Sequence, residues 1–302
     1  MRRILAWLLS GCLLLLLAGC GAESPQKSSD KLQIVATLFP QYDFARQIAG
    51  EKADVSMLLL PGADSHSYDP SASDILKISD ADLFLYTGKY MEPWAEQVIS
   101  ALAESDVKVV DVSAGITLDQ EEDSDHDYDP HIWTSPLNAA QMTDTILSAL
   151  CEVDSQNASY YTTNAADYQD QLKQLDQSFR DVVRGAVRTE IIFGSRFAMH
   201  YFVKEYGLTC YSAFDSCTAE SEPSAKGLSD LVEKIKTDQI PVVYYEELSD
   251  PKIAQTLAEE TGCQILLLHS CHNVSKQEFE DGVTYLDLMK QNVENLKQGL
   301  WQ

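Results

Sequence analysis

Residues 55–70 read VSMLLLPGADSHSYDP, a stretch typical of an α/β fold that holds a ligand at the end of a strand. The apolar run Val55–Leu60 predicts a buried strand that ends in a turn at Pro61. A helix is predicted to start at Ser71, so His66 lies on the short loop between the strand and the helix. Such loops line the ligand crevices of open α/β sheets, and His66 is therefore a candidate ligand.

Two further histidines occupy comparable positions. His131 lies in the motif DPHIW at residues 129–133, and His269 follows the apolar run Gln264–Leu268. A single loop histidine is usually a solvated residue, but three histidines at the ends of separate elements indicate a common site. Because neutral imidazole is a frequent metal ligand, the pattern predicts a metal site assembled from both halves of the chain.

The composition limits the possible functions. With 302 residues, the chain is long enough for two domains with full cores. Its formal net charge is -25 at pH 7, whereas contacts to nucleic-acid phosphates require lysine and arginine. No nucleic-acid partner is therefore expected, and the acidic balance favours solubility without specifying a site.

Residues 1–20 have the pattern of a lipoprotein signal peptide. Two arginines precede the apolar stretch Ile4–Leu17, which is too short for a comfortable transmembrane helix. The segment ends in LAGC, a lipobox pattern that predicts lipidation of Cys20 rather than an ordinary cleavage nearby. The polar residues 21–31 predict a flexible tether. The protein is thus expected outside the cytoplasm, anchored to the cell membrane by lipid.

Strands and helices alternate along both halves of the remaining chain. This alternation predicts an α/β fold of two lobes, each with a mainly parallel sheet flanked by helices. Residues 32–155 are expected to form the N-terminal lobe and residues 188–302 the C-terminal lobe. Between them, residues 156–187 predict a long rigid connecting helix of about 35–40 Å. A stiff connector predicts small lobe motions rather than a wide hinge closure.

An acidic segment interrupts the N-terminal lobe at residues 119–129, where seven of eleven residues are carboxylates and His126 is the one histidine. Its charge predicts an exposed loop. Two interpretations stay open for this segment. It is either a solvated linker or a loop that weakly gathers cations beside the entrance to the site.

Five of the seven cysteines lie beyond the signal peptide. An odd number leaves at least one thiol without a disulfide partner. Cys217 and Cys271 fall in loops that are expected near the site, so these two are expected to pair. A zinc–thiolate site is the alternative, but the sequence has no CxxC spacing to support it.

Several motifs occur in the order known from one protein family. They are Val35–Pro40, Pro61-Gly62 with His66 and Tyr68–Pro70, Asp129–Trp133, Tyr206–Leu208, Glu222–Ser224 and Tyr285–Met289. Together they resemble the metal-binding receptors of bacterial ABC importers that carry zinc or manganese, across essentially the whole mature chain. The resemblance implies two α/β lobes joined by a long helix, with the metal between them. It also implies a monomer that delivers metal to a membrane permease driven by a cytoplasmic ATPase.

The resemblance also implies where the ligands lie. The two N-lobe ligands of the family match His66 and His131. The third ligand, a His or Glu, matches Arg196, which cannot bind a cation. His200 lies four residues further on, and on the helix predicted for Phe197–Glu205 it would share that face.

The fourth ligand of the family, usually Asp or Glu, falls at His269. His272 takes its place if the loop has a different register. The resemblance therefore implies a metal site formed by His66, His131, His200 and His269.

The identity of the metal follows from the ligand types. Imidazole suits zinc, copper and nickel, whereas manganese prefers carboxylate and water. A histidine site therefore predicts Zn²⁺ as the captured ion. A ligand supplied by Glu220, Glu222 or Glu246 would favour manganese instead, and iron is a further alternative.

Two other functions are compatible with an exported protein of this kind. An exported zinc hydrolase would need a carboxylate base beside an open metal position, typically in an HExxH motif, and the sequence has none. The protein is therefore expected not to be an enzyme. A surface adhesin on the same fold is the second rival, which fold alone does not distinguish.

Overall fold

The computed structural model describes residues 31–120, 128–212, 214 and 223–302, whose strands form two four-stranded sheets. The strands are β1 (Leu32–Ala36), β2 (Ala53–Met57), β3 (Leu83–Tyr86), β4 (Lys108–Asp111), β5 (Glu190–Phe193), β6 (Thr209–Ser212), β7 (Val242–Tyr245) and β8 (Gln264–Leu267). Their orders are β2-β1-β3-β4 and β6-β5-β7-β8, with parallel pairing throughout each sheet. The predicted fold of two parallel α/β lobes is confirmed, and both lobes share one topology.

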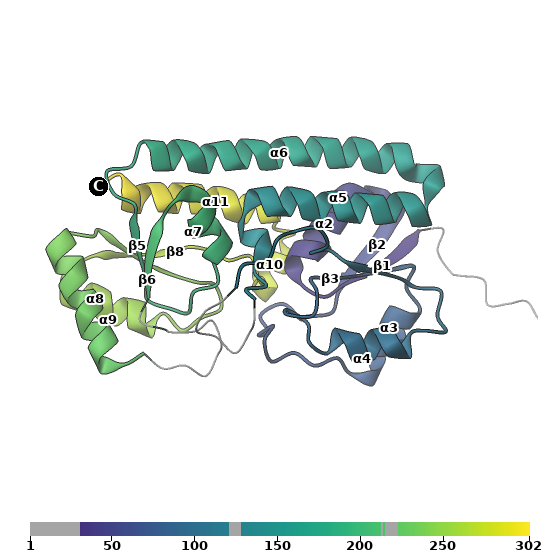
Figure 1. The fold of residues 1–302 in the computed structure, drawn as a ribbon, viewed down its shortest axis with the longest axis horizontal. Coiled ribbons are helices and arrows are strands. Elements are labelled where there is room, and N and C mark those ends of the chain that lie inside the picture. Colours follow the sequence, from purple (N-terminus) through teal and green to yellow (C-terminus); the bar gives the residue numbers. More distant parts are fainter. Residues whose placement is uncertain (1–30, 121–127, 213, 215–222) are drawn as a thin grey trace, which may run out of the picture. The chain divides into compact units, whose positions relative to one another are not determined.

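Helices cover both sheets (Figure 1). They are α2 (Phe39–Ala49), α3 (Ala72–Ser79), α4 (Ala95–Ala101), α5 (Pro136–Val153), α6 (Ala158–Arg184), α7 (His200–Tyr206), α8 (Ala225–Asp238), α9 (Lys252–Thr261), α10 (Lys276–Glu280) and α11 (Tyr285–Leu300). None of the helices in the described part of the chain combines the length and the apolar character needed to cross a membrane.

The long helix α6 connects the two lobes. It packs against α2 and α5 beside the first sheet and against α7 and α11 beside the second. Its buried positions run from Tyr161 to Val182 at spacings of three or four residues, which places one apolar stripe against both lobes. The expected long connecting helix is therefore present, while the exact lobe boundaries stay a prediction.

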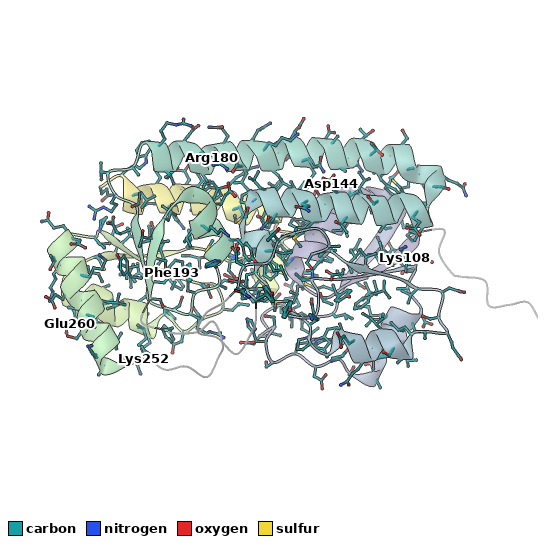
Figure 2. All side chains as sticks on the ribbon, viewed as in Figure 1. Lys108, Asp144, Arg180, Phe193, Lys252 and Glu260 are labelled. Atoms are coloured by element: carbon teal, nitrogen blue, oxygen red, sulfur yellow. The ribbon has the colours of Figure 1, made fainter. Side chains whose placement is uncertain are left out.

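Helix α9 packs very closely against strand β5 of the second sheet. Phe193 at the end of β5 is fully buried, whereas Glu260 projects from the outer helix α9 (Figure 2). Gly194 follows directly, and an added Cβ there would lie 2.6 Å from the Cα of Ala254 in α9. Only glycine permits this approach of helix to strand.

The carboxyl ends of the strands in both sheets meet at one region. The loop after β2 is tied to the segment after β8 because Gly62 N donates to the carbonyl of Val274 at 2.8 Å. The indole nitrogen of Trp133, beyond β4, donates to the carbonyl of Ser270 at 2.8 Å. The loops that carry the predicted histidines are thus held together by direct hydrogen bonds.

The helix predicted from Phe197 begins later than expected, because α7 starts at His200. The reason is a tertiary contact: the backbone N–H of Ala198 donates to the buried carboxyl group of Glu246 at 2.6 Å. Arg196 therefore precedes the helix. The expectation that His200 shares a helix face with Arg196 is wrong.

A buried carboxyl group lies under the loop after β3. Glu92 accepts hydrogen bonds from the Thr37 hydroxyl and from Thr87 N, the latter at 3.0 Å. Burial raises the pKa of Glu92 to about 8, even though both hydrogen bonds act to lower it. The folded protein therefore keeps Glu92 protonated at pH values at which the unfolded chain ionises it.

Glu92→Gln is expected to flatten the pH dependence of stability between pH 4.5, the ordinary glutamate pKa, and pH 8. In this window the folded state binds more protons than the unfolded state, so wild-type stability falls as the pH rises. The variant lacks this group, and its melting temperature relative to wild type should increase from pH 5 to pH 8. Thermal melts across that range measure the effect. Exposed Glu96→Gln is the control, and parallel curves for Glu92→Gln and wild type would contradict the prediction.

Candidate metal site

Three histidines from separate loops come together at the carboxyl ends of the strands. Each of His66, His131 and His272 offers one ring nitrogen, and these nitrogens lie within 4.8 Å of one another. The ring centroids are 5.5 Å apart for His66 and His131, 5.0 Å for His66 and His272, and 4.8 Å for His131 and His272. This spacing suits three imidazoles around one metal ion.

His131 is the most rigidly held of the three. Its side chain is buried, and its Nδ1 donates to Asp129 Oδ1 at 2.8 Å, while its backbone N–H donates to the same oxygen at 2.7 Å. Burial alone would raise the pKa of Asp129, but the charge and hydrogen bonds of His131 outweigh it and hold that pKa below its usual value. The Nε2 atom of His131 is buried and has no hydrogen-bond partner among the described residues. A carboxylate on one ring nitrogen and an unpaired second nitrogen is the arrangement of a metal-binding histidine.

His272 comes from the segment after β8. Its Nε2 forms a hydrogen bond of 2.8 Å with the Ser65 hydroxyl, and its backbone N–H donates to Glu247 Oε1 at 3.0 Å. Trp133 lies beside it, with ring centroids 5.1 Å apart. Burial lowers the pKa of His272 well below the usual imidazole value, and the neighbouring imidazoles add to the effect. The ring is therefore neutral at physiological pH, as a metal ligand must be.

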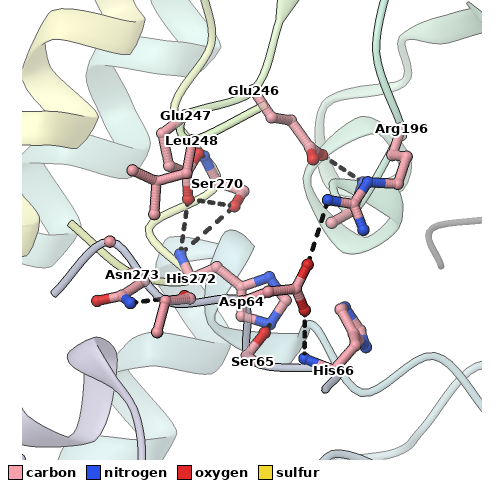
Figure 3. Close-up of a pocket in the computed structure, with 13 residues that line it drawn as sticks. Asp64, Ser65, His66, Arg196, Glu246, Glu247, Leu248, Ser270, His272 and Asn273 are labelled. Atoms are coloured by element: carbon pink, nitrogen blue, oxygen red, sulfur yellow. Dashed lines mark hydrogen bonds and ion pairs between the residues drawn. The ribbon is translucent and has the colours of Figure 1, made fainter. Parts of the chain in front are cut away.

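His66 completes the cluster from the loop after β2. Asp64 shapes this loop, because its Oδ1 accepts the backbone N–H of His66 at 2.8 Å and that of Ser67 at 3.3 Å. His66 and His272 also line a pocket of about 90 Å³ on the side where Arg196 lies (Figure 3). The cluster thus adjoins a small polar pocket.

His269 and His200, the other two predicted ligands, lie outside this cluster. His269 is buried, and its Nδ1 accepts the backbone N–H of Cys271 at 2.9 Å. His200 is 44% exposed, with its Nε2 3.4 Å from Asp119 Oδ2. His272, the reserve position, takes the place that the sequence predicted for His269.

The difference between His269 and His272 has a local backbone cause. The side chain of Asn292 accepts the backbone N–H of His269 at 2.7 Å and donates to its carbonyl at 2.7 Å. Cys271 then has a left-handed φ of 61°, which turns the chain. The turn directs His272 toward the other two histidines.

Several predicted features fall on residues that the structure does not describe. Cys217, Glu220, Glu222 and His126 belong to this group, as does Cys20. The expected Cys217–Cys271 disulfide therefore stays a prediction, and no disulfide joins the four described cysteines.

Asp129→Asn is expected to weaken zinc binding by about 10–100-fold, the usual cost of losing a group that orients a ligand. Asparagine lacks the charge that holds the Nδ1 proton of His131. Competition with a chromophoric chelator measures the affinity. Asp119→Asn removes a carboxylate outside the cluster and should leave it unchanged, whereas an unaltered affinity in Asp129→Asn would contradict the assignment.

Comparison with known proteins places the chain in a family. Residues 34–299 match the family described as zinc-uptake complex component A, periplasmic. The high-affinity zinc uptake system protein ZnuA of Bacillus subtilis is 34% identical over 302 residues, which cover 95% of this chain and 94% of that protein.

Two further similarities involve a streptococcal protein. The zinc-binding lipoprotein AdcA of Streptococcus pneumoniae is 32% identical over 99% of this chain, although the match spans only 61% of AdcA. The crystal structure of the Zn(II)-bound ZnuA-like domain of that protein has a TM-score of 0.79 and 30% identity, and covers 90% of this chain and 100% of the domain. These matches confirm the resemblance inferred from the motifs, and the chain belongs to the family of periplasmic zinc-uptake component A proteins.

Proposed function

We propose that this protein captures Zn²⁺ outside the cytoplasm through His66, His131 and His272 and delivers it to an ABC importer. The observation that carries the proposal is the convergence of three imidazole nitrogens within 4.8 Å, from loops of both lobes. The names of its relatives, a zinc uptake protein and a zinc-binding lipoprotein, support the same ion.

The donor set favours zinc on chemical grounds. Three neutral imidazoles suit Zn²⁺, whereas manganese prefers carboxylate and water ligands. The buried Nε2 of His131 has no hydrogen-bond partner in the described structure, and binding a metal would satisfy it. Zinc capture would therefore remove the energetic cost of leaving this buried nitrogen unpaired.

A receptor role rather than catalysis fits the surroundings of the cluster. The carboxylates beside it are held by hydrogen bonds, as Glu247 is by the backbone N–H and hydroxyl of Ser270, both at 2.7 Å. Both oxygens of Glu247 thus already accept hydrogen bonds from the protein. We propose that the protein releases its ion to a partner without chemical change.

The partner and the location follow from the family and from the N-terminal segment. The partner would be the permease of an ABC importer with its cytoplasmic ATPase, served by a monomeric receptor. Lipidation at Cys20 would anchor the protein, with residues 21–31 as tether. Both proposals rest on sequence, since Cys20 lies outside the described residues.

The test is the metal content of the full mature chain after purification from medium that contains zinc and manganese together. We expect one zinc per chain, retained in His200→Ala and lost in His66→Ala. Stoichiometric manganese would contradict the choice of metal. A chain without bound metal would contradict metal capture and favour the adhesin alternative.

A further inference from the structure

Three carboxylates line the pocket beside the histidine cluster, and each is held by other groups. Glu247 accepts hydrogen bonds from Ser270 and from the backbone N–H of His272. Glu246 accepts the backbone N–H of Ala198, and burial raises its pKa to about 8, with Glu247 acting in the same direction. Hydrogen bonds therefore occupy the oxygens of Glu247, and the raised pKa of Glu246 keeps that carboxyl group mostly protonated at neutral pH.

Asp64 is the third carboxylate and the closest in sequence to a ligand. Its Oδ1 accepts the backbone N–H of His66, which leaves Oδ2 as the oxygen available for another partner. That partner is Arg196 from the other lobe, whose Nη2 lies 3.5 Å from Asp64 Oδ2. Figure 3 shows the guanidinium of Arg196 pointing into the pocket above Asp64, with Glu246 on its other side.

We infer that Arg196 is a selectivity residue, which holds Asp64 away from the metal and so keeps the site purely imidazole. This inference rests on the proposed function. Arg196 carries a fixed positive charge, so it competes with a bound cation for the free oxygen of Asp64. The side chain of Arg196 is 24% exposed and that of Asp64 is 33% exposed, so a metal ion can reach the pair and compete with Arg196 for Asp64.

Loss of Arg196 changes the donor set available to a metal. Asp64 lines the same pocket as His66 and His272, and its Oδ2 would then have no guanidinium beside it. A carboxylate ligand raises manganese binding more than zinc binding, because the hard oxygen donor is the one that manganese prefers. Arg196 thus favours zinc over manganese by withholding a ligand rather than by providing one.

The experiment measures zinc and manganese affinities of the full mature chain by chelator competition. In Arg196→Ala we expect manganese affinity to rise about tenfold, within the range typical of changes beside a metal ligand, and zinc affinity to change by less than about threefold. In the double variant Arg196→Ala with Asp64→Asn, the gain in manganese affinity should disappear. Arg196→Lys keeps the positive charge and should preserve most of the preference for zinc.

Two control variants distinguish a specific effect of Arg196 from general damage to the site or the fold. Asp64→Asn alone keeps an oxygen that can accept the His66 N–H, and it should show no gain in manganese affinity. Arg184→Ala removes an exposed arginine that pairs with Asp181 far along α6, and it should alter neither metal.

The possible outcomes test the selectivity role of Arg196 separately from zinc capture. An unchanged zinc-to-manganese ratio in Arg196→Ala would overturn the inference, as would a manganese gain that persists in the double variant. Either result would leave zinc capture by the wild-type protein intact. Only a wild-type chain that fails to bind zinc would overturn both proposals.

Discussion

Replacement of His272 by alanine is expected to abolish stoichiometric zinc binding while leaving the protein folded. The variant removes one of three converging imidazoles, so the loss should exceed the roughly 10–100-fold that a missing orienting group costs. Within the described part of the chain, the side chain of His272 makes one hydrogen bond to another side chain, that with Ser65. Its loss should therefore cost little stability beyond a small cavity.

His269→Ala is the matched comparison, because this histidine lies three residues earlier in the same segment and is itself buried. We expect it to lose stability, since the N–H of Cys271 then lacks its acceptor, but to keep one zinc per chain. Elemental analysis and thermal melts of both variants give the two readouts. Zinc retained by His272→Ala and lost by a folded His269→Ala would assign the ligand to the position first expected from sequence.

The fold was largely predictable because its signals are local. The apolar run Val55–Leu60, which predicted a strand, overlaps β2 (Ala53–Met57), since buried parallel strands are apolar along their length. The strand β6 was missed. Its residues, Thr209–Ser212, are partly exposed and only weakly apolar, and they form a strand because β5 offers them a pairing edge.

The site was predictable where a ligand lies in a distinctive local motif. His66 and His131 come together as expected, and their role as ligands stays a prediction. The second lobe offered two histidines in the sequence HSCH, and sequence spacing alone does not show which one faces the cleft. Asn292, more than twenty residues away, and the backbone turn at Cys271 determine which histidine faces the other two.

Asp43 is a second residue whose role the neighbouring sequence does not predict. It lies on α2, its side chain is fully buried, and its Oδ1 accepts a hydrogen bond from Arg46 at 2.8 Å. Its Oδ2 accepts the backbone N–H of Tyr285, the first residue of α11, at 2.8 Å. Arg46 in turn donates to the carbonyl of Val283 at 2.7 Å. This pair therefore ties the first lobe to the helix that closes the second.

Asp43→Ala is expected to destabilise the protein by about 3 kcal/mol, the lower end of the usual cost of breaking a buried ion pair. The change leaves Arg46 without its counter-ion and the N–H of Tyr285 without its acceptor. Arg46 is 27% exposed, and water there limits the loss. At about 2–4 °C per kcal/mol, the melting temperature should fall by about 6–12 °C.

The same change should also weaken zinc binding, because two ligands lie in one lobe and the third in the other. If Asp43 fixes the spacing of the lobes, saturating zinc will restore part of the lost melting temperature, since binding favours the folded state. Asp43→Asn keeps the shape of the side chain and an acceptor for the N–H of Tyr285. It should therefore lose less stability and less zinc affinity than Asp43→Ala. Exposed Asp54→Ala is the control. A large fall in stability with unchanged zinc affinity would mean that Asp43 supports the core without setting the distance between His272 and the two histidines of the first lobe.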